Sequence, residues 1–147
     1  MNKIFPPLLL LMCLLLMVLL RWAWPIGIVF PVPINLLGTV PLLLGVFVSV
    51  SAERQFARVG TNVNPFGEPG KLVTDGWFRY SRNPMYLGLT LVAVGVAILL
   101  EALLPMMGVA VFVVMAERRY IPYEEKRLFA RFGPAYEDYQ SRVRRWI

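Results

Sequence analysis

The sequence contains no histidine and a single cysteine, Cys13. Without histidine the chain cannot build a His-ligated zinc or iron site, a Ser-His-Asp hydrolase centre or an imidazole acid–base pair. Cys13 lies in an apolar run, so an internal disulfide is excluded and a thiolate metal site is not expected. We therefore expect no metal, and any chemistry must use carboxylates, Arg, Lys, Tyr or backbone groups.

Charged residues are also scarce. They make up 16% of the 147 residues, against 58% hydrophobic residues, which leaves too little polar surface for a soluble domain of this size. The length predicts one domain, residues 1–147. The net charge is +6, but Lys and Arg cluster at the edges of apolar runs. That distribution favours membrane lipids as partners and argues against nucleic acid.

Four apolar runs predict an all-α, polytopic membrane protein with about four transmembrane helices, at residues 4–24, 34–52, 85–101 and 103–120. In the first run, Arg21 and Trp22 stand where small residues would mark a signal-peptide cleavage site, so we expect a retained span. The last two runs, fused, would make a helix of about 46 Å, too long for a hydrocarbon core of about 30 Å. They predict a helical hairpin that turns near Glu101 to Pro105.

The second apolar run has a face of small residues, made by Gly38, Gly45 and Ser49. Such a face suits the close packing of two helices.

Basic residues are distributed unevenly among the connections. They concentrate in the loop 53–84 and the tail 121–147, whereas the other two connections hold only Arg21 between them. The positive-inside rule then places the loop, the tail and both termini in the cytoplasm. We expect an integral protein of the plasma (inner) membrane of a prokaryote.

The loop 53–84 lacks sustained helical or strand periodicity, and structureless connections of this length are usually functional or disordered. Its aromatic residues favour a folded lid. Its glycines match neither a dinucleotide fingerprint nor a Walker loop. The tail predicts a helix that begins near Glu117 and stops at Gly133-Pro134, followed by a short helix from Ala135 to Arg142. On their own, these tail residues favour a solvated charged face over a functional site.

Several short motifs follow one another in the second half of the chain. They are Leu72-Val-Thr-Asp-Gly76, Arg82-Asn-Pro-Met-Tyr-Leu-Gly88, Glu124-Glu125, and Phe132-Gly-Pro-Ala-Tyr136 with Tyr139. The ordered set resembles the isoprenylcysteine carboxyl methyltransferase family, the wider group that includes phospholipid N-methyltransferases. The usual pattern is Leu-Val-x-x-Gly, Arg-His-Pro-x-Tyr-x-Gly, a helical hairpin, Glu-Glu, and Phe-Gly-x-x-Tyr-x-x-Tyr. The resemblance extends from about Arg54 to Trp146.

The resemblance implies a methyltransferase that uses S-adenosyl-L-methionine, releases S-adenosyl-L-homocysteine, and holds its cofactor at the cytoplasmic membrane boundary. The positions implied as cofactor contacts are Lys71, Leu72, Val73, Phe78, Asn83, Pro84, Met85, Tyr86 and Glu124. Charge and aromaticity add Arg82, for the cofactor carboxylate, and Tyr136, for its adenine or sulfonium. The catalytic candidates are Glu125 as a proton acceptor, and Tyr120 with its neighbour Arg119.

Two positions depart from the family pattern. Asn83 replaces the usual histidine, and an amide forms hydrogen bonds but does not titrate near neutral pH. Tyr120 stands where the prenylcysteine enzymes have a substrate-binding Arg, which puts a prenylcysteine carboxylate in doubt. A carboxylate or thiolate acceptor needs no general base, whereas an amine must lose a proton.

The acceptor therefore stays open among lipophilic or small membrane-accessible molecules: a carboxylate, a thiol or a lipid amine. The sequence does not predict an oligomeric state. The alternative to an enzyme is a helical membrane protein whose basic tail binds a partner or anionic lipid. Under that alternative, Arg82 and Tyr86 are anchors at a membrane entry.

Overall fold

The computed structural model describes residues 5–24, 27–60, 67 and 70–147. Within this part of the chain the regular elements are helices, and the one strand-like feature is an isolated bridge between Ile28 and Ala102. The helices are α1 (Pro6–Ala23), η1 (Ile34–Gly38), α2 (Thr39–Val59), η2 (Gly76–Arg79), α3 (Pro84–Leu99), α4 (Met106–Met115), η3 (Ala116–Tyr120), α5 (Ile121–Phe132) and α6 (Pro134–Arg142). The expected all-helical class is confirmed for these residues.

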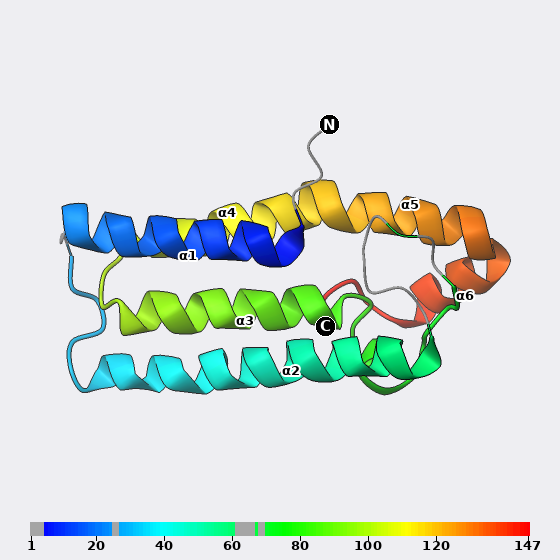
Figure 1. Ribbon diagram of the computed structural model, residues 1–147, viewed down its shortest axis with the longest axis horizontal. Coiled ribbons are helices and arrows are strands. Elements are labelled where there is room, and N and C mark those ends of the chain that lie inside the picture. Colours follow the sequence, from blue (N-terminus) through cyan, green and yellow to red (C-terminus); the bar gives the residue numbers. More distant parts are fainter. Residues whose placement is uncertain (1–4, 25–26, 61–66, 68–69) are drawn as a thin grey trace.

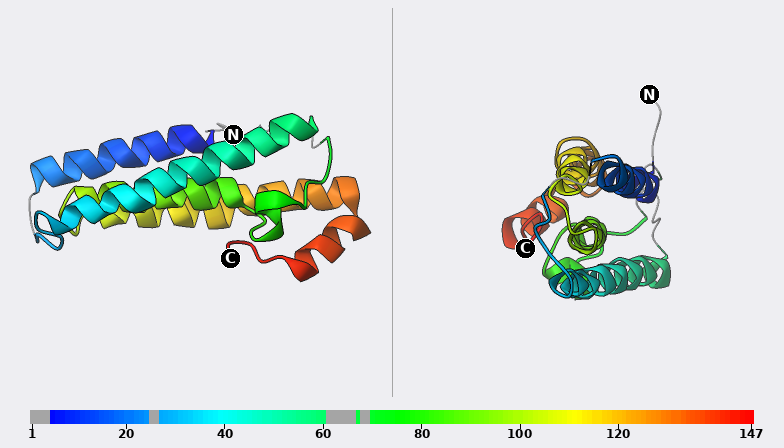
Figure 2. Two further views of the ribbon diagram at one scale, coloured as in Figure 1. Left: turned by 90° about the horizontal axis from the view of Figure 1, so that it is seen from below. Right: turned by 90° about the vertical axis from the view of Figure 1, so that its left-hand side faces the viewer.

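The four apolar helices lie side by side in an elongated bundle (Figure 1). Seen end-on, α3 lies between α2 on one side and the pair α1 and α4 on the other (Figure 2). The expected hairpin is present: α3 ends at Leu99, the chain reverses at Glu101 with φ of 64°, and α4 begins at Met106. The described loop residues 70–83, α5, α6 and the C-terminus all lie away from this turn, toward the opposite end of the molecule (Figure 1).

Two helical stretches are long and apolar enough to cross a membrane, Pro6–Ala23 and Ile34–Val59. Most of their large apolar side chains are exposed, as Leu19 and Phe47 illustrate at 60% and 62%. The stretch Pro84–Leu99 is apolar but shorter. An unpartnered apolar surface of this extent suits a lipid surrounding.

Two boundaries differ from the sequence prediction. The second helix does not end at residue 52 but continues to Val59, where Gly60 terminates it with φ of 70°. The charged residues Glu53 and Arg54 lie exposed, while Ala52 is buried, so the extension is an amphipathic helix rather than a loop. The loop proper therefore starts at Gly60; residues 61–66, 68 and 69 lie outside the described residues.

The fourth apolar helix also continues past its expected end. The elements α4, η3 and α5 follow without interruption, with η3 forming a π-helical turn at Ala116–Tyr120 (Figure 1). The tail helix expected from Glu117 is thus the polar extension of α4. It stops at Gly133, with φ of 51°, and α6 follows as expected.

Helices α2 and α3 approach each other closely through glycines. A Cβ added at Gly88 would lie 2.6 Å from the carbonyl oxygen of Gly45, and one at Gly95 would lie 2.6 Å from that of Gly38. Ser49 belongs to the same face and donates a hydrogen bond to the Met85 carbonyl, at 3.3 Å. The expected small-residue face is confirmed, and it fixes α2 against the start of α3.

The buried apolar residues form two clusters. One lies between α1, α3 and α4 and includes Cys13 and Phe112. The other joins the end of α2 to η2 and α6, and includes Phe78 and Tyr139. The second cluster gives the polar end of the bundle an apolar core of its own, against which the loop residues from 70 onward are held.

Candidate functional site

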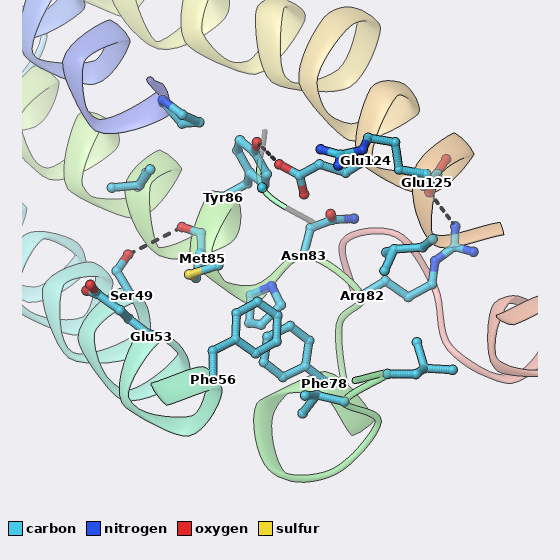
Figure 3. A pocket seen from close by; sticks show the side chains of 18 of the residues that line it. Ser49, Glu53, Phe56, Phe78, Arg82, Asn83, Met85, Tyr86, Glu124 and Glu125 are labelled. Atoms are coloured by element: carbon cyan, nitrogen blue, oxygen red, sulfur yellow. Dashed lines mark hydrogen bonds and ion pairs between the residues drawn. The ribbon is translucent and has the colours of Figure 1, made fainter. Parts of the chain in front are cut away.

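A cavity of about 220 Å³ opens at the polar end of the bundle, among α2, the start of α3, α5 and α6 (Figure 3). Every residue that the sequence predicted as a cofactor contact lines it: Lys71, Leu72, Val73, Phe78, Arg82, Asn83, Pro84, Met85, Tyr86, Glu124 and Tyr136. The structure thus brings together two motifs that a helical hairpin separates in the sequence.

The segment Asn83–Tyr86 reaches the cavity because Pro84 begins α3. Proline suits the first helical position, where its fixed φ is helical and its missing N–H has no partner to lose. The Asn83 N–H donates to the Ser81 hydroxyl at 3.1 Å, and its carbonyl accepts from the Leu87 N–H at 3.0 Å. Residues 83–86 therefore form a rigid edge where the bundle meets the loop.

The two motifs meet through a hydrogen bond between Tyr86 and Glu124. The Tyr86 hydroxyl donates to Glu124 Oε1 at 2.5 Å (Figure 3). Burial raises the pKa of Glu124 to about 7; the Tyr86 hydrogen bond and the charge of Arg127 oppose this rise, while the negative charge of Glu125 adds to it. Glu124 is therefore a half-buried carboxyl group whose charge changes near neutral pH.

The neighbouring carboxylate, Glu125, has a different environment. It pairs with Arg82 at 3.1 Å and with Arg145, whose Nε and Nη2 donate to its two oxygens at 3.1 and 2.6 Å. The side chains of Arg82 and Glu125 are only 12% and 13% exposed. The Nε of Arg82 is buried and has no hydrogen-bond partner among the described residues. One guanidinium donor of this cavity-lining residue is therefore buried and unused.

Aromatic rings form another wall of the cavity. Phe56 and Phe78 stack with centroids 4.5 Å apart and an interplanar angle of 12° (Figure 3). The Tyr139 hydroxyl donates to the Phe78 carbonyl at 2.6 Å, which fixes η2 against α6. Burial raises the pKa of Tyr136 to about 12, so this phenol stays neutral at physiological pH.

Comparison with known proteins shows the family of the chain. The model of the phospholipid methyltransferase family matches residues 34–135, which include α2, the hairpin and the Glu124–Glu125 pair. The chain belongs to the phospholipid methyltransferase family. The resemblance drawn from the ordered motifs is confirmed.

Relatives of this family member agree with the assignment. The chain is 32% identical over 116 residues to a probable protein-S-isoprenylcysteine O-methyltransferase of Oryza sativa subsp. indica. The matched region covers 75% of this chain and 59% of the rice protein. The chain is 37% identical over 76 residues to protein-S-isoprenylcysteine O-methyltransferase B of Arabidopsis thaliana, covering 52% of this chain and 39% of that protein. An uncharacterized protein of Haemophilus influenzae matches over its full length, at 35% identity over 63 residues. No solved structure matches the chain.

The chain therefore spans about three fifths of the length of the rice relative, and less of the Arabidopsis one.

The predicted catalytic residues of this phospholipid methyltransferase family member are not all at the cavity. Glu125 lines it. Tyr120 is buried beside Tyr86, with ring centroids 6.3 Å apart, and does not line the cavity. Arg119 is exposed in the π-helical turn and does not line the cavity either. The structure brings Glu125 together with the predicted cofactor contacts, but not Arg119 or Tyr120.

Sequence reasoning missed the contribution of α2. Ser49, Glu53 and Phe56 all line the cavity, and their spacing places them on one helical face. This signal was present in the sequence, but ending the helix at residue 52 concealed it. The residues at the start of α1 that line the cavity, Phe5, Pro6 and Pro7, carry no comparable pattern.

Proposed function

We propose that the chain is an S-adenosyl-L-methionine-dependent methyltransferase that acts at the cytoplasmic face of a membrane on a lipophilic or small membrane-accessible acceptor. Family membership supports the reaction class. The observation that supports the cofactor most directly is the convergence of an unpartnered Arg82 Nε, a half-buried Glu124 carboxyl and an aromatic wall on one cavity.

The chemistry of these groups fits the cofactor. S-adenosyl-L-methionine carries a carboxylate, an ammonium, a sulfonium and an adenosine. The free Arg82 donor suits the carboxylate, and the Glu124 carboxylate suits the ammonium or the ribose hydroxyls. The faces of Phe78 and Tyr86 suit adenine or the sulfonium cation. The carboxylate and the ammonium of the cofactor thus each have an oppositely charged partner on the cavity wall, and the sulfonium has aromatic faces.

The bound cofactor would supply an electrophilic methyl group: an acceptor nucleophile would bond to the methyl carbon as the carbon–sulfur bond breaks, with S-adenosyl-L-homocysteine as the leaving group. The residues of this chain align the reactants and exclude water, and orientation of this kind provides much of the catalysis in bimolecular displacements. Apolar side chains of Pro6, Met85 and Leu89 line the side of the cavity toward the bundle, which suits a lipophilic acceptor.

The proposed topology has four spans: α1, the stretch from η1 through most of α2, α3, and α4 with its π-helical turn. Basic residues gather at the end that holds the cavity, whereas Arg21 lies at the other end, where it pairs with Glu101 at 3.5 Å. The positive-inside rule then places the cavity in the cytoplasm, where the soluble cofactor is available.

Calorimetric titration of the purified protein with S-adenosyl-L-homocysteine tests the proposal. We expect binding in roughly the micromolar range. Glu124→Ala should weaken it at least about tenfold, because the variant loses a charge-assisted contact. Glu137→Ala, at an exposed position of α6, serves as the matched control and should leave binding unchanged.

A radiolabelled methyl-transfer assay on membrane lipid extract, small thiols and prenylcysteine analogues in parallel identifies the acceptor class. A well-folded sample that binds no S-adenosyl-L-homocysteine contradicts the proposal. It then favours the non-enzymatic protein whose basic tail binds a partner or anionic lipid.

A further inference from the structure

Residues 143–146, which we call the tail segment, turn back from α6 and run along the start of α3 (Figure 1). The Arg144 carbonyl accepts a hydrogen bond from the Arg82 N–H at 3.0 Å. The Arg145 carbonyl accepts from the Asn83 side-chain amide at 3.0 Å. The tail segment thus contacts two residues of the proposed cofactor site through its own backbone.

The side chain of Arg145 links the tail segment to the opposite wall. It donates to both oxygens of Glu125, and it also pairs with Glu117 in the π-helical turn. The indole N–H of Trp146 donates to the second oxygen of Glu117 at 2.7 Å. The start of α3 and the continuous helix of η3 and α5, which are distant in the sequence, are therefore held together by one guanidinium and its neighbours.

This arrangement decides how Arg82 meets Glu125. An arginine and a carboxylate prefer a two-point pair in which two parallel N–H groups donate to two oxygens. Arg145 occupies both oxygens of Glu125 in this way, so Arg82 reaches only Oε1, through Nη2, at 3.1 Å. The Nε of Arg82 lies on the same edge of the guanidinium group as Nη2. It is buried without a hydrogen-bond partner in a residue that lines the cavity.

We infer that Arg145 is a positioning residue for the methyl donor: by occupying Glu125, it keeps the Arg82 Nε available for the donor's carboxylate. The inference rests on the proposed function and adds a residue to it. Without Arg145, Glu125 offers both oxygens to Arg82, and the resulting two-point pair consumes the Nε. The contacts to the nucleoside part of the ligand come from other residues and stay as they are.

Two ligands separate this role from a structural one. S-adenosyl-L-homocysteine carries the amino-acid carboxylate, whereas 5′-methylthioadenosine has the same nucleoside and no carboxylate. Arg145→Gln should weaken the binding of S-adenosyl-L-homocysteine by about tenfold or more, because a charge-assisted hydrogen bond is lost. It should change the affinity for 5′-methylthioadenosine by less than about twofold. Arg145→Lys, which keeps the charge but makes a single-point contact, should give an intermediate loss. Calorimetry on the full-length protein measures all of these.

The matched control is Arg142→Gln, three residues earlier, whose exposed side chain pairs with Asp138 and with no other residue that the structure describes. It should leave both affinities unchanged. Retained binding of 5′-methylthioadenosine shows that a variant is folded. If Arg145→Gln and Arg145→Lys weaken the binding of both ligands equally, the tail segment merely supports the fold. If the affinity for S-adenosyl-L-homocysteine is unchanged, Arg145 has no role in binding the methyl donor. If the wild-type protein binds neither ligand, the proposed function is wrong, and this inference is wrong as well.

Discussion

Glu124 and Glu125 are adjacent in the chain but have opposite surroundings. Glu124 accepts from one neutral hydroxyl and is half-buried, so burial raises its pKa to about 7. Glu125 lies between two guanidinium groups. A pair of identical side chains thus divides into one group that titrates near neutral pH and one that organises arginines.

The raised pKa of Glu124 makes stability and ligand binding respond to pH in opposite ways. In the unfolded chain this carboxyl has its ordinary pKa of 4.5. Between about pH 4.5 and 7 the folded state holds the extra proton, so stability falls as the pH rises through this window. Binding of the ligand ammonium requires the carboxylate, so affinity should rise over the upper part of the same window. Thermal melts and calorimetry from pH 5 to 8 measure both.

Glu124→Gln separates the two effects. At pH 8 the variant should be more stable than the wild type by about 1–3 kcal/mol, because it no longer carries a half-buried charge. Its affinity for S-adenosyl-L-homocysteine should be lower and independent of pH. Glu137→Gln is the exposed control and should change neither quantity. A Glu124→Gln variant that is less stable at pH 8, with wild-type pH dependence of binding, would show that Glu124 is not the titrating group.

Sequence motifs located the residues around 83–86, 124 and 136, because those positions form recognisable strings. They did not locate the ion pairs of Glu117, Glu125 and Arg145, because pairing depends on how the tail folds back. Nothing in the spacing of these residues encodes that return. The free donor on Arg82 is a consequence of the same geometry and was equally beyond the sequence.

At the scale of elements, the interface between α2 and α3 positions both sides of the cavity. Ser49, Glu53 and Phe56 come from α2, and the segment Asn83–Tyr86 comes from α3. The glycine contacts set the distance between these helices. The sequence predicted the small-residue face and the hairpin from composition and length, but not the helical extension to Val59, because charged residues there suggested an end to the apolar run.

Gly88→Ala tests this interface. The added Cβ meets the backbone carbonyl of Gly45, which cannot rotate away, so we expect a loss of stability of about 1–3 kcal/mol and weaker binding of S-adenosyl-L-homocysteine. Val40→Ala is the control, since Val40 lies on the exposed face of α2 and makes no close helix contact of this kind. Thermal unfolding in detergent compares the two variants. Equal stabilities would mean that close approach of α2 and α3 is not required.

At the scale of the whole molecule, the fold gathers the basic loop, the basic tail and the cavity at one end (Figure 1). Charge counting in the sequence predicted that these segments share a side, because topology depends on composition rather than on detailed packing. Charge counting did not predict the cavity itself, because the residues that line it are spread along the described chain from Phe5 to Tyr139.

Cysteine labelling tests the proposed orientation. In a background with Cys13→Ala, single cysteines at Arg58 and Asp138 probe the cavity end, and one at Leu103 probes the turn between α3 and α4. We expect a membrane-impermeant maleimide to label only the Leu103→Cys protein in intact bacterial cells, and the other two after permeabilisation. Labelling of the sites at 58 and 138 on opposite sides would exclude a shared cytoplasmic cavity.

The uninterrupted helix from Met106 to Phe132 has a mechanical consequence. Its first half lies in the apolar bundle and its second half carries both acidic residues of the cavity. A helix that tilts to match a thinner or thicker bilayer moves as a rod, so its displacement in lipid reaches Glu124 and Glu125. The π-helical turn is the point where such a rod bends, so under the proposed function we expect its stiffness to decide how strongly the acyl-chain length of the lipids influences the affinity for the cofactor.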